Sequence, residues 1–287
     1  HLQGVKPQHM VSGYPTSEND TVHQYAAEYY DILPRGHRGT LTIRLTGAPT
    51  VRVIGNDPYE ANNEWWSNRY DNMDSTLTRS FDLTNLRGKR ATLEFATWFD
   101  LERDYDYAFV EVSPDGQNWM TLKGAYTTTS NPNAANWGNG YTGISGNSDS
   151  PQWVQEHMDL TPYAGKKIQV RFEEVTDDAV NLQGFALDNI RIPELNFQDT
   201  LSTDNGWVSN GFIRSNNVLP EYYTVQALVY SGQTFSVSTM TIDPATDQGT
   251  LTVPNFGSRI PHVVLIVSAY AAETTLLAHY QLDVSLS

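Results

Sequence analysis

The sequence contains no cysteine, and this absence excludes several kinds of structure and chemistry. A chain without thiols forms no disulfides, holds no cysteine-ligated zinc and has no thiol nucleophile. If the protein is secreted, bound cations rather than disulfides would tie its loops together. The sequence also lacks any apolar run approaching the roughly 20 residues that span a bilayer. We therefore expect no membrane insertion.

Basic residues are scarce. The chain has 18 Lys and Arg against 33 Asp and Glu, which gives a formal net charge of −15. A surface this acidic repels nucleic acids and anionic membranes, so we expect no nucleic-acid partner. The same charge suits the binding of divalent cations, and it also suits plain solubility.

Three familiar catalytic arrangements are missing as well. Residues 143–147 (GISGN) lack the final glycine of a nucleophile elbow. Glu173 and Glu174 are adjacent, so on a strand they would point to opposite faces and could not flank one glycosidic bond. No glycine-rich phosphate loop precedes a helical pattern.

What the sequence does contain is a repeated alternation of apolar and polar residues. It runs through TLTRSFDL, ATLEFATWFDL, KIQVRFEEV and GFALDNIRI, and turn residues separate these stretches. A period of two over short segments, with no long helical pattern between them, indicates strands of a sandwich or jelly roll. We predict an all-β protein with a jelly-roll sandwich and a second, smaller sandwich of the immunoglobulin or fibronectin kind.

Four segments can be assigned within this fold. Residues 1–20 are predicted to form an extended N-terminal arm, residues 60–193 the jelly roll, and residues 194–287 a C-terminal β-sandwich. Residues 21–59 hold too few strands to fold alone. We favour their joining the C-terminal sandwich, with the jelly roll inserted between them. The alternative is that they cap the jelly roll.

Several of these segments resemble one family. WWSNRYDNMDSTLTRSFDL, DYDYAFVEVSPDGQNW and GFALDNIRIPE are similar to the non-catalytic C-terminal region of M6, immune inhibitor A-like metallopeptidases. VHQYAAEYYDI, GWVSNGFIRSNNVLP and VVLIVSAYAAETTLLAHYQLDV resemble the same region, so the resemblance spans most of residues 21–285. Its central portion is similar to MAM-like jelly rolls. The resemblance implies secretion, a calcium-stabilised jelly roll and attachment to a protease.

The chain departs from that family at the catalytic motif. M6 peptidases bind zinc through His-Glu-x-x-His, in which two imidazoles one helical turn apart hold the metal and the glutamate activates water. None of the seven histidines here is followed by Glu, and no two are four residues apart. We therefore predict that the chain is not an enzyme. It is either a fragment of a protease or a module used without one.

Structural calcium is the expected cofactor. Calcium takes six to eight oxygen ligands, often from flexible loops. Acidic residues crowd the predicted connections between strands, and Asp188 stands among apolar strand residues, where a carboxylate needs a partner. The candidate ligands are Asp71, Asp74, Asp106, Asp177 and Asp188. The alternative for each is a solvated turn residue.

Aromatic residues in or beside the loops are candidates for ligand binding. Rings with polar neighbours offer a stacking surface at low entropic cost. The candidates are Trp65, Trp66, Trp137, Tyr141 and Trp153. They suggest a protein or carbohydrate partner at the cell surface, with ordinary packing as the alternative. Trp98 and Trp119 lie in strand patterns and are predicted to be core residues.

A second functional class stays open beside the accessory module. The N-terminal arm has no core pattern of its own, and such an arm can dock on its own molecule or add a strand to a neighbour's open sheet edge. Repeated head to tail, the second contact would build a homopolymeric extracellular fibre or tube.

Overall fold

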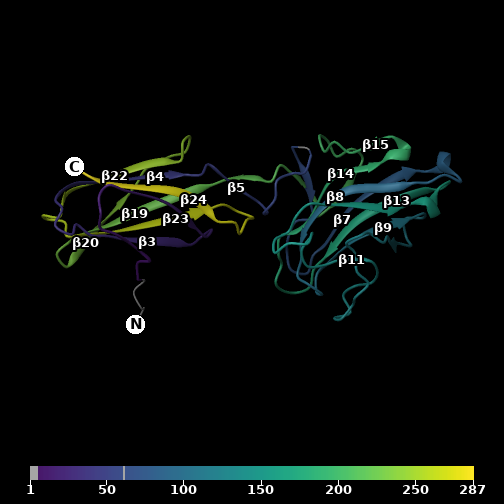
Figure 1. Cartoon of the computed structure of the whole chain (residues 1–287), viewed down its shortest axis with the longest axis horizontal. Coiled ribbons are helices and arrows are strands. Elements are labelled where there is room, and N and C mark those ends of the chain that lie inside the picture. The colour runs from purple at the N-terminus through teal and green to yellow at the C-terminus, as the bar shows by residue number, and fades with distance from the viewer. Residues whose placement is uncertain (1–5, 61) are drawn as a thin grey trace. The chain divides into compact units, whose positions relative to one another are not determined.

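The computed structural model describes residues 6–60 and 62–287, and almost every element in them is a β-strand (Figure 1). The predicted all-β fold is confirmed. The chain divides into two compact units. Unit 1 comprises His1–Ile54 and Val218–Ser287, and unit 2 is the continuous segment Gly55–Asn217. None of the helices among the described residues is long and apolar enough to cross a membrane.

Unit 2 is a sandwich of two sheets. Its strands are β6 (Glu64–Trp66), β7 (Asp74–Asp82), β8 (Thr92–Asp100), β9 (Tyr107–Ser113), β10 (Met120–Thr121), β11 (Gly140–Tyr141), β12 (Val154–Asp159), β13 (Lys167–Val175), β14 (Gly184–Ile192), β15 (Phe197–Gln198), β16 (Val208–Asn210) and β17 (Ile213–Ser215). Three-residue 3-10 turns connect some of them: η1 (Thr84–Leu86), η2 (Thr161–Tyr163) and η3 (Pro193–Leu195). One sheet has the order β10-β9-β13-β7-β16, and β11 also pairs with β9. The other has the order β12-β8-β14-β6-β17, and β15 also pairs with β14.

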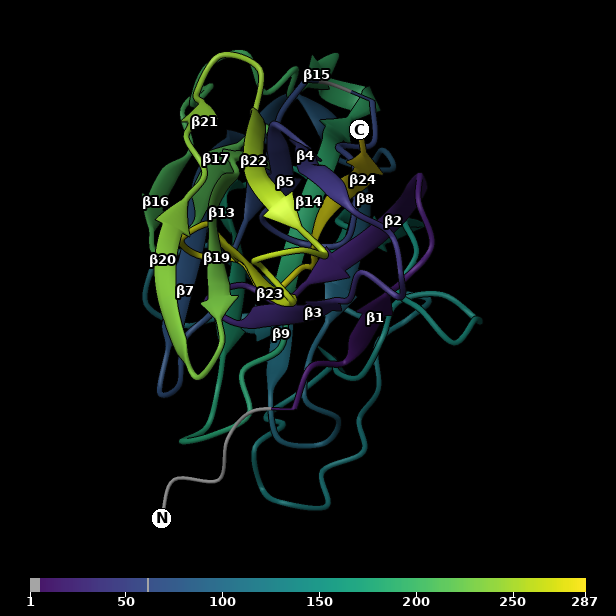
Figure 2. The same cartoon turned by 90° about the vertical axis from the view of Figure 1, so that its left-hand side faces the viewer.

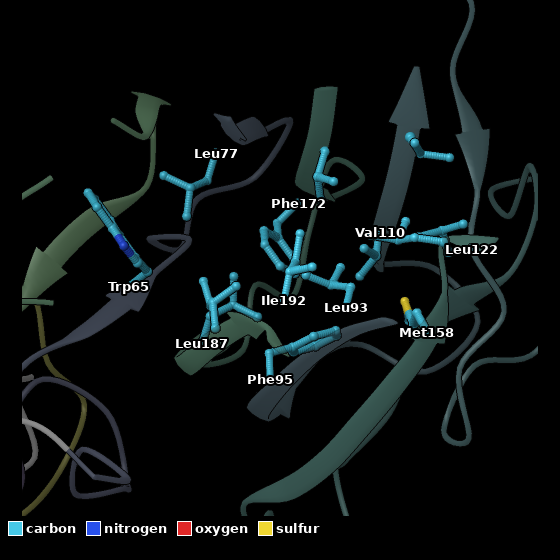
Figure 3. Packing of buried hydrophobic residues seen from close by; sticks show 14 of the residues in the cluster. Trp65, Leu77, Leu93, Phe95, Val110, Leu122, Met158, Phe172, Leu187 and Ile192 are labelled. Atoms are coloured by element: carbon cyan, nitrogen blue, oxygen red, sulfur yellow. The ribbon is translucent and has the colours of Figure 1, made fainter. Parts of the chain in front are cut away.

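The core of unit 2 lies between these sheets (Figure 3). Strand β13 shows how its sequence builds the core, because Ile168, Val170 and Phe172 alternate with polar residues and are buried. Phe172 meets Phe95 of β8 across the sandwich, with ring centroids 5.2 Å apart in an edge-to-face arrangement. The period-two pattern therefore places apolar side chains of both sheets against each other.

Unit 1 is a second sandwich, whose two sheets can be followed in Figure 2. Its strands are β1 (His9–Val11), β2 (Thr16–Val22), β3 (Ala27–Ile32), β4 (Gly39–Gly47), β5 (Thr50–Arg52), β18 (Val218–Pro220), β19 (Tyr222–Ser231), β20 (Thr234–Thr239), β21 (Ile242–Asp243), β22 (Gln248–Phe256), β23 (His262–Tyr270) and β24 (Ala278–Leu286). The sheet orders are β1-β3-β23-β19-β20 and β2-β24-β4-β22-β21, and β5 and β18 form a separate pair. Strand β23, the apolar run HVVLIVSAY, lies at the centre of its sheet.

The predicted extended N-terminal arm carries two strands. Residues 1–5 of that arm lie outside the described residues. Strand β1 runs parallel to β3, and β2 pairs with β24 over seven residues. Both are edge strands of unit 1. The arm therefore contributes two strands to its own molecule, and its polar sequence suits the solvent-facing edge of a sheet.

Residues 194–217 also differ from expectation. Sequence analysis grouped them with the C-terminal sandwich, but they belong to unit 2. Strand β16 pairs with β7 and β17 pairs with β6, so each extends one sheet of unit 2. Trp207 and Phe212 are buried in the same core as Phe172. These two aromatic side chains account for the attachment of a loop-rich segment to the jelly roll.

Candidate functional site

Three carboxylates meet at one end of the unit 2 sandwich. Glu102 and Asp106 lie in the connection from β8 to β9, and Asp177 follows β13. One oxygen of each lies within 4.8 Å of those of the other two. We call these three residues the acidic cluster. Sequence analysis named Asp106 and Asp177 as ligands and left Glu102 out of the candidate set.

Strand pairing explains why residues 75 positions apart in the chain come together. In the antiparallel pair of β9 and β13, Tyr107 lies opposite Val175, so the residues just before β9 adjoin those just after β13. The backbone N–H of Asp177 donates to Oδ1 of Asp106 at 2.9 Å. The N–H of Asp106 donates to the carbonyl of Glu102 at 3.0 Å, which closes the turn.

Asp106 is the buried member of the cluster, with 1% of its surface exposed. Burial raises the pKa of its carboxyl to about 6, and the nearby carboxylates of Asp177 and Glu102 add to the rise. Burial, with a contribution from Asp177, also raises the pKa of Glu102. The neighbouring carboxylates therefore disfavour ionisation of Asp106 and Glu102, and a bound cation would remove that cost.

The direction of this shift sets how stability depends on pH. The folded pKa of Asp106 lies above its ordinary value of 3.8, so folding favours the protonated form. That contribution to stability is complete below about 3.8 and is lost as pH rises through about 6. Above that pH the carboxyl of Asp106 is ionised.

A fourth acid lies close by in the interior. Glu174 on β13 has 1% of its surface exposed, and its Oε2 has no hydrogen-bond partner among the described residues. Burial raises its pKa to about 8, a hydrogen bond with Ser67 opposes the rise, and the carboxyl of Asp106 adds to it. Its neighbour Glu173 faces the other side of the sheet and contacts Arg171. The two glutamates therefore cannot act as a glycosidase pair.

The remaining predicted calcium ligands lie outside the cluster. Asp71 is exposed in the loop before β7 and accepts a hydrogen bond from Nδ2 of Asn181 at 2.7 Å. Asp74 is exposed at the start of β7. Their loop does adjoin the cluster, because the N–H of Asn72 donates to the carbonyl of Asp177 at 2.5 Å.

Asp188 has a different partner from the one that sequence analysis supposed. It is 1% exposed on β14, and its carboxylate accepts the N–H of Glu60 at 3.0 Å and that of Asn189 at 2.6 Å. The pairing of β14 with β8 is irregular between Asp188 and Arg191. Backbone donors thus satisfy the carboxylate, and it ties residue 60 to the sheet.

Most of the aromatic candidates are packing residues. Trp65, Trp66 and Tyr141 are at most 4% exposed, so they offer no stacking surface to a ligand. The tryptophans belong to β6, which lies between β14 and β17 and is covered on both faces. Sequence analysis did not predict this burial, because β6 is only three residues long and its neighbours in the chain resemble a loop.

The other tryptophans divide differently. Trp137 is 54% exposed, and its ring stacks on Phe109 with centroids 4.2 Å apart. Trp153 is half-buried and donates its Nε1–H to the carbonyl of Asp57 at 2.8 Å. Trp98 is buried as predicted. The prediction for Trp119 is wrong: it is half-buried and its ring lies against the guanidinium of Arg171, with 4.2 Å from Cζ to the ring centroid.

Comparison with known proteins identifies the family of this chain. The immune inhibitor A-like MAM domain matches residues 35–217. Pre-pro-metalloprotease PrtV of Vibrio cholerae is 32% identical over 188 residues, which are 62% of this chain and 19% of PrtV. Immune inhibitor A of Bacillus thuringiensis is 31% identical over 128 residues, 44% of this chain and 16% of that protein. Bacillopeptidase F of Bacillus subtilis is 29% identical over 98 residues, 34% of this chain and 5% of that protein.

The chain thus spans about a fifth or less of the length of these relatives. The family match covers all of unit 2 and part of unit 1. It confirms the resemblance seen in the sequence segments to the non-catalytic region of M6 peptidases. The chain belongs to the immune inhibitor A-like MAM domain family.

Proposed function

We propose that the chain is a non-catalytic, extracellular accessory module of the kind found in secreted M6 metallopeptidases. The observation that carries this proposal is the family match over residues 35–217. Two of the relatives it resembles are named as a metalloprotease and as immune inhibitor A, and the chain corresponds to only 19% and 16% of their lengths. A segment of that size can recur as one module of a larger protein.

We also propose that calcium stabilises unit 2 at the acidic cluster. Glu102, Asp106 and Asp177 supply three carboxylates from two loops, and calcium prefers such hard oxygen ligands and fills its shell with carbonyls and water. Asp106 is buried with a raised pKa, because burial and the neighbouring carboxylates of Asp177 and Glu102 disfavour its ionised form. Bound calcium would supply a compensating positive charge and hold the β8–β9 connection against the end of β13.

Calcium should therefore raise the melting temperature of unit 2, and more so at pH 8 than at pH 5. Binding to the folded state alone adds about 2.7 kcal/mol when free calcium is about 100 times Kd. Protons compete for Asp106 below its pKa of about 6, so the effect should shrink at pH 5. All seven tryptophans lie within Gly55–Asn217, so tryptophan fluorescence reports this unit.

Two variants sharpen the measurement. Asp106→Asn should abolish the calcium effect and leave calcium-free stability at pH 8 equal to or above that of the parent, because a buried charge is removed. Asp178→Asn, at an exposed neighbouring acid, should melt like the parent. Superimposable curves with calcium and with chelator at pH 8 would refute the calcium site.

The purified chain should not cleave casein, with or without added zinc. Metal-activated water needs ligands that converge on one ion, and the described histidines stand on separate strands and loops. His157, the one histidine next to a glutamate in the order Glu-His, is paired with Glu94 at 3.4 Å. Casein cleavage that a zinc chelator abolishes and that His157→Ala reduces would contradict the non-catalytic assignment.

The partner of the module is a separate proposal. A protein or a carbohydrate at the cell surface suits an accessory module, and the acidic surface disfavours nucleic acid. Homopolymerisation through residues 1–20 stays a prediction. Strand donation by β1 or β2 would first require these strands to leave β3 and β24.

A further inference from the structure

The outer face of one unit 2 sheet carries a fixed indole platform. Trp137 lies over β9, where one side of its ring covers Phe109 at 4.2 Å and an interplanar angle of 21°. Its Nε1–H donates to Oε1 of Glu111 at 3.5 Å. The side chain is nevertheless 54% exposed. A ring held from below and at its edge offers its free face to a ligand with little entropy left to lose.

A second indole lies on the same face and is linked to the first through two charged groups. Arg171 of β13 donates from Nε to Oε2 of Glu111 at 2.7 Å and from Nη2 to Oε2 of Glu173 at 3.1 Å. The ring of Trp119 lies against the guanidinium of Arg171. Glu111 therefore contacts both Trp137 and Arg171. The two tryptophans stand beside one rigid, planar, polar group.

A groove continues from this group along the sheet. On β13, Gln169 lies two residues before Arg171 and faces the same side of the sheet. The strand register places Ser113 of β9 and Ser80 of β7 on either side of Gln169, just as it places Glu111 and Thr78 on either side of Arg171. Ser80, Ser113 and Gln169 line a groove of about 630 Å³. Hydroxyl and amide groups both donate and accept hydrogen bonds, so this floor matches a ligand that does the same.

The charges on this face largely compensate one another. Burial, followed by the neighbouring Glu111 carboxylate, raises the pKa of Glu173 well above its ordinary value. The guanidinium of Arg171 lies between the carboxyl groups of Glu111 and Glu173 and donates a hydrogen bond to each. A charged ligand would upset this balance, whereas an uncharged ligand leaves it intact. The groove lining adds Lys167, which pairs with Asp82 at 3.7 Å, and Asp115, whose carboxylate accepts the N–H groups of Gln117 and Asn118. The face thus offers aromatic rings and bidentate polar groups, and each of its two cations, Arg171 and Lys167, is paired with a carboxylate.

We propose that this face, formed by Trp119, Trp137, Glu111, Arg171 and the Ser80–Gln169 groove, binds a neutral oligosaccharide. The apolar C–H face of a pyranose ring stacks on an indole, and its neighbouring hydroxyls match the paired atoms of carboxylate, guanidinium and amide groups. A few polar groups beside aromatic walls fix the orientation of a small ligand. This inference deepens the accessory-module function and rests on it, because it names what such a module would hold.

The test is isothermal titration calorimetry of the full chain with chitohexaose, cellohexaose, laminarihexaose and mannohexaose. We expect at least one to bind with Kd below about 1 mM. Trp137→Ala and Trp119→Ala should each weaken that binding about tenfold or more. Tyr222→Ala should not, because Tyr222 is a 46% exposed ring that stacks on Tyr270 in unit 1 and contributes nothing to this face of unit 2. Cooperative urea unfolding of each variant verifies that it is folded.

Three results would overturn the proposal. The first is no heat of binding with any of the four sugars, and the second is parent-like binding by Trp137→Ala and Trp119→Ala. The third is binding of carboxymethylated, unglycosylated α-lactalbumin through the same tryptophans without sugar binding, which would assign the face to polypeptide. Melting and casein assays test the accessory-module function separately, so failure of one proposal is distinguishable from failure of the other.

Discussion

Phe172→Ala should lower the free energy of unfolding of unit 2 by about 4 kcal/mol, because it removes a fully buried ring from the junction of its two sheets. Phe172 projects from β13 and meets Phe95 of β8 edge-on at 5.2 Å (Figure 3). Its ring centroid also lies 5.6 Å from that of Trp207. The truncation leaves a cavity between rigid strands that cannot collapse to fill it, and it loses both aromatic contacts.

Urea unfolding followed by tryptophan fluorescence measures this loss in unit 2 alone. Val208→Ala is the matched control, because Val208 is 70% exposed on edge strand β16 of the same unit and its truncation should change stability by no more than about 0.5 kcal/mol. If Phe172→Ala and Val208→Ala lowered the free energy of unfolding equally, the contacts of Phe172 with Phe95 and Trp207 would not be what holds the two sheets together.

Strands in which apolar and polar residues alternate regularly could be predicted from the sequence, whereas polar edge strands could not. Residues 167–175 (KIQVRFEEV) read directly as a strand with one buried face, and β13 has that form. Residues 16–22 (TSENDTV) bury Val22 alone and pair with β24 on one side only. An edge strand needs few apolar residues, because solvent covers much of it. Periodicity therefore carried no signal for β2.

The candidate metal site could be predicted only in part, for a related reason. Acidic residues in the predicted loops are visible in the sequence, and they identified Asp106 and Asp177 as candidate ligands. Which loops converge depends on strand pairing, since the β9–β13 register brings the two together. Glu102 joins them through the turn that its carbonyl closes. Asp188 was included because a buried acid needs a partner, but that partner is backbone N–H groups.

Trp65 and Trp119 show the same limit for aromatic residues. Trp65 stands beside polar residues in the chain, yet its side chain is buried in the core of unit 2. Trp119 stands in an alternating pattern, yet it faces outward onto Arg171. Local sequence describes a side chain's own strand, whereas exposure depends on what other strands place over it.

Glu156→Ala should lower the free energy of unfolding of unit 2 by about 3 kcal/mol, because Glu156 is the buried acceptor of three hydrogen bonds. Its side chain is fully buried on β12 and accepts hydrogen bonds from the N–H groups of Ala125 and Tyr126 at 2.7 and 2.9 Å. The hydroxyl of Tyr141 donates to Oε1 at 3.1 Å. Removing the acceptor leaves three donors without this partner, each at a cost of about 1–3 kcal/mol unless water enters.

The same contacts link Glu156 to the proposed sugar-binding face. Residues 125 and 126 precede Trp137 in the long connection from β10 to β11, and Tyr141 follows it in β11, so Glu156 contacts the chain on both sides of the segment that carries the platform. Gly124 permits this approach, because a Cβ there would lie 2.5 Å from Oε1 of Glu156. Glu156→Gln retains one acceptor oxygen and should recover part of the stability that Glu156→Ala loses. Urea unfolding and sugar titration of both variants separate the two effects. Parent-like stability of Glu156→Ala would show that the loop is held by other contacts.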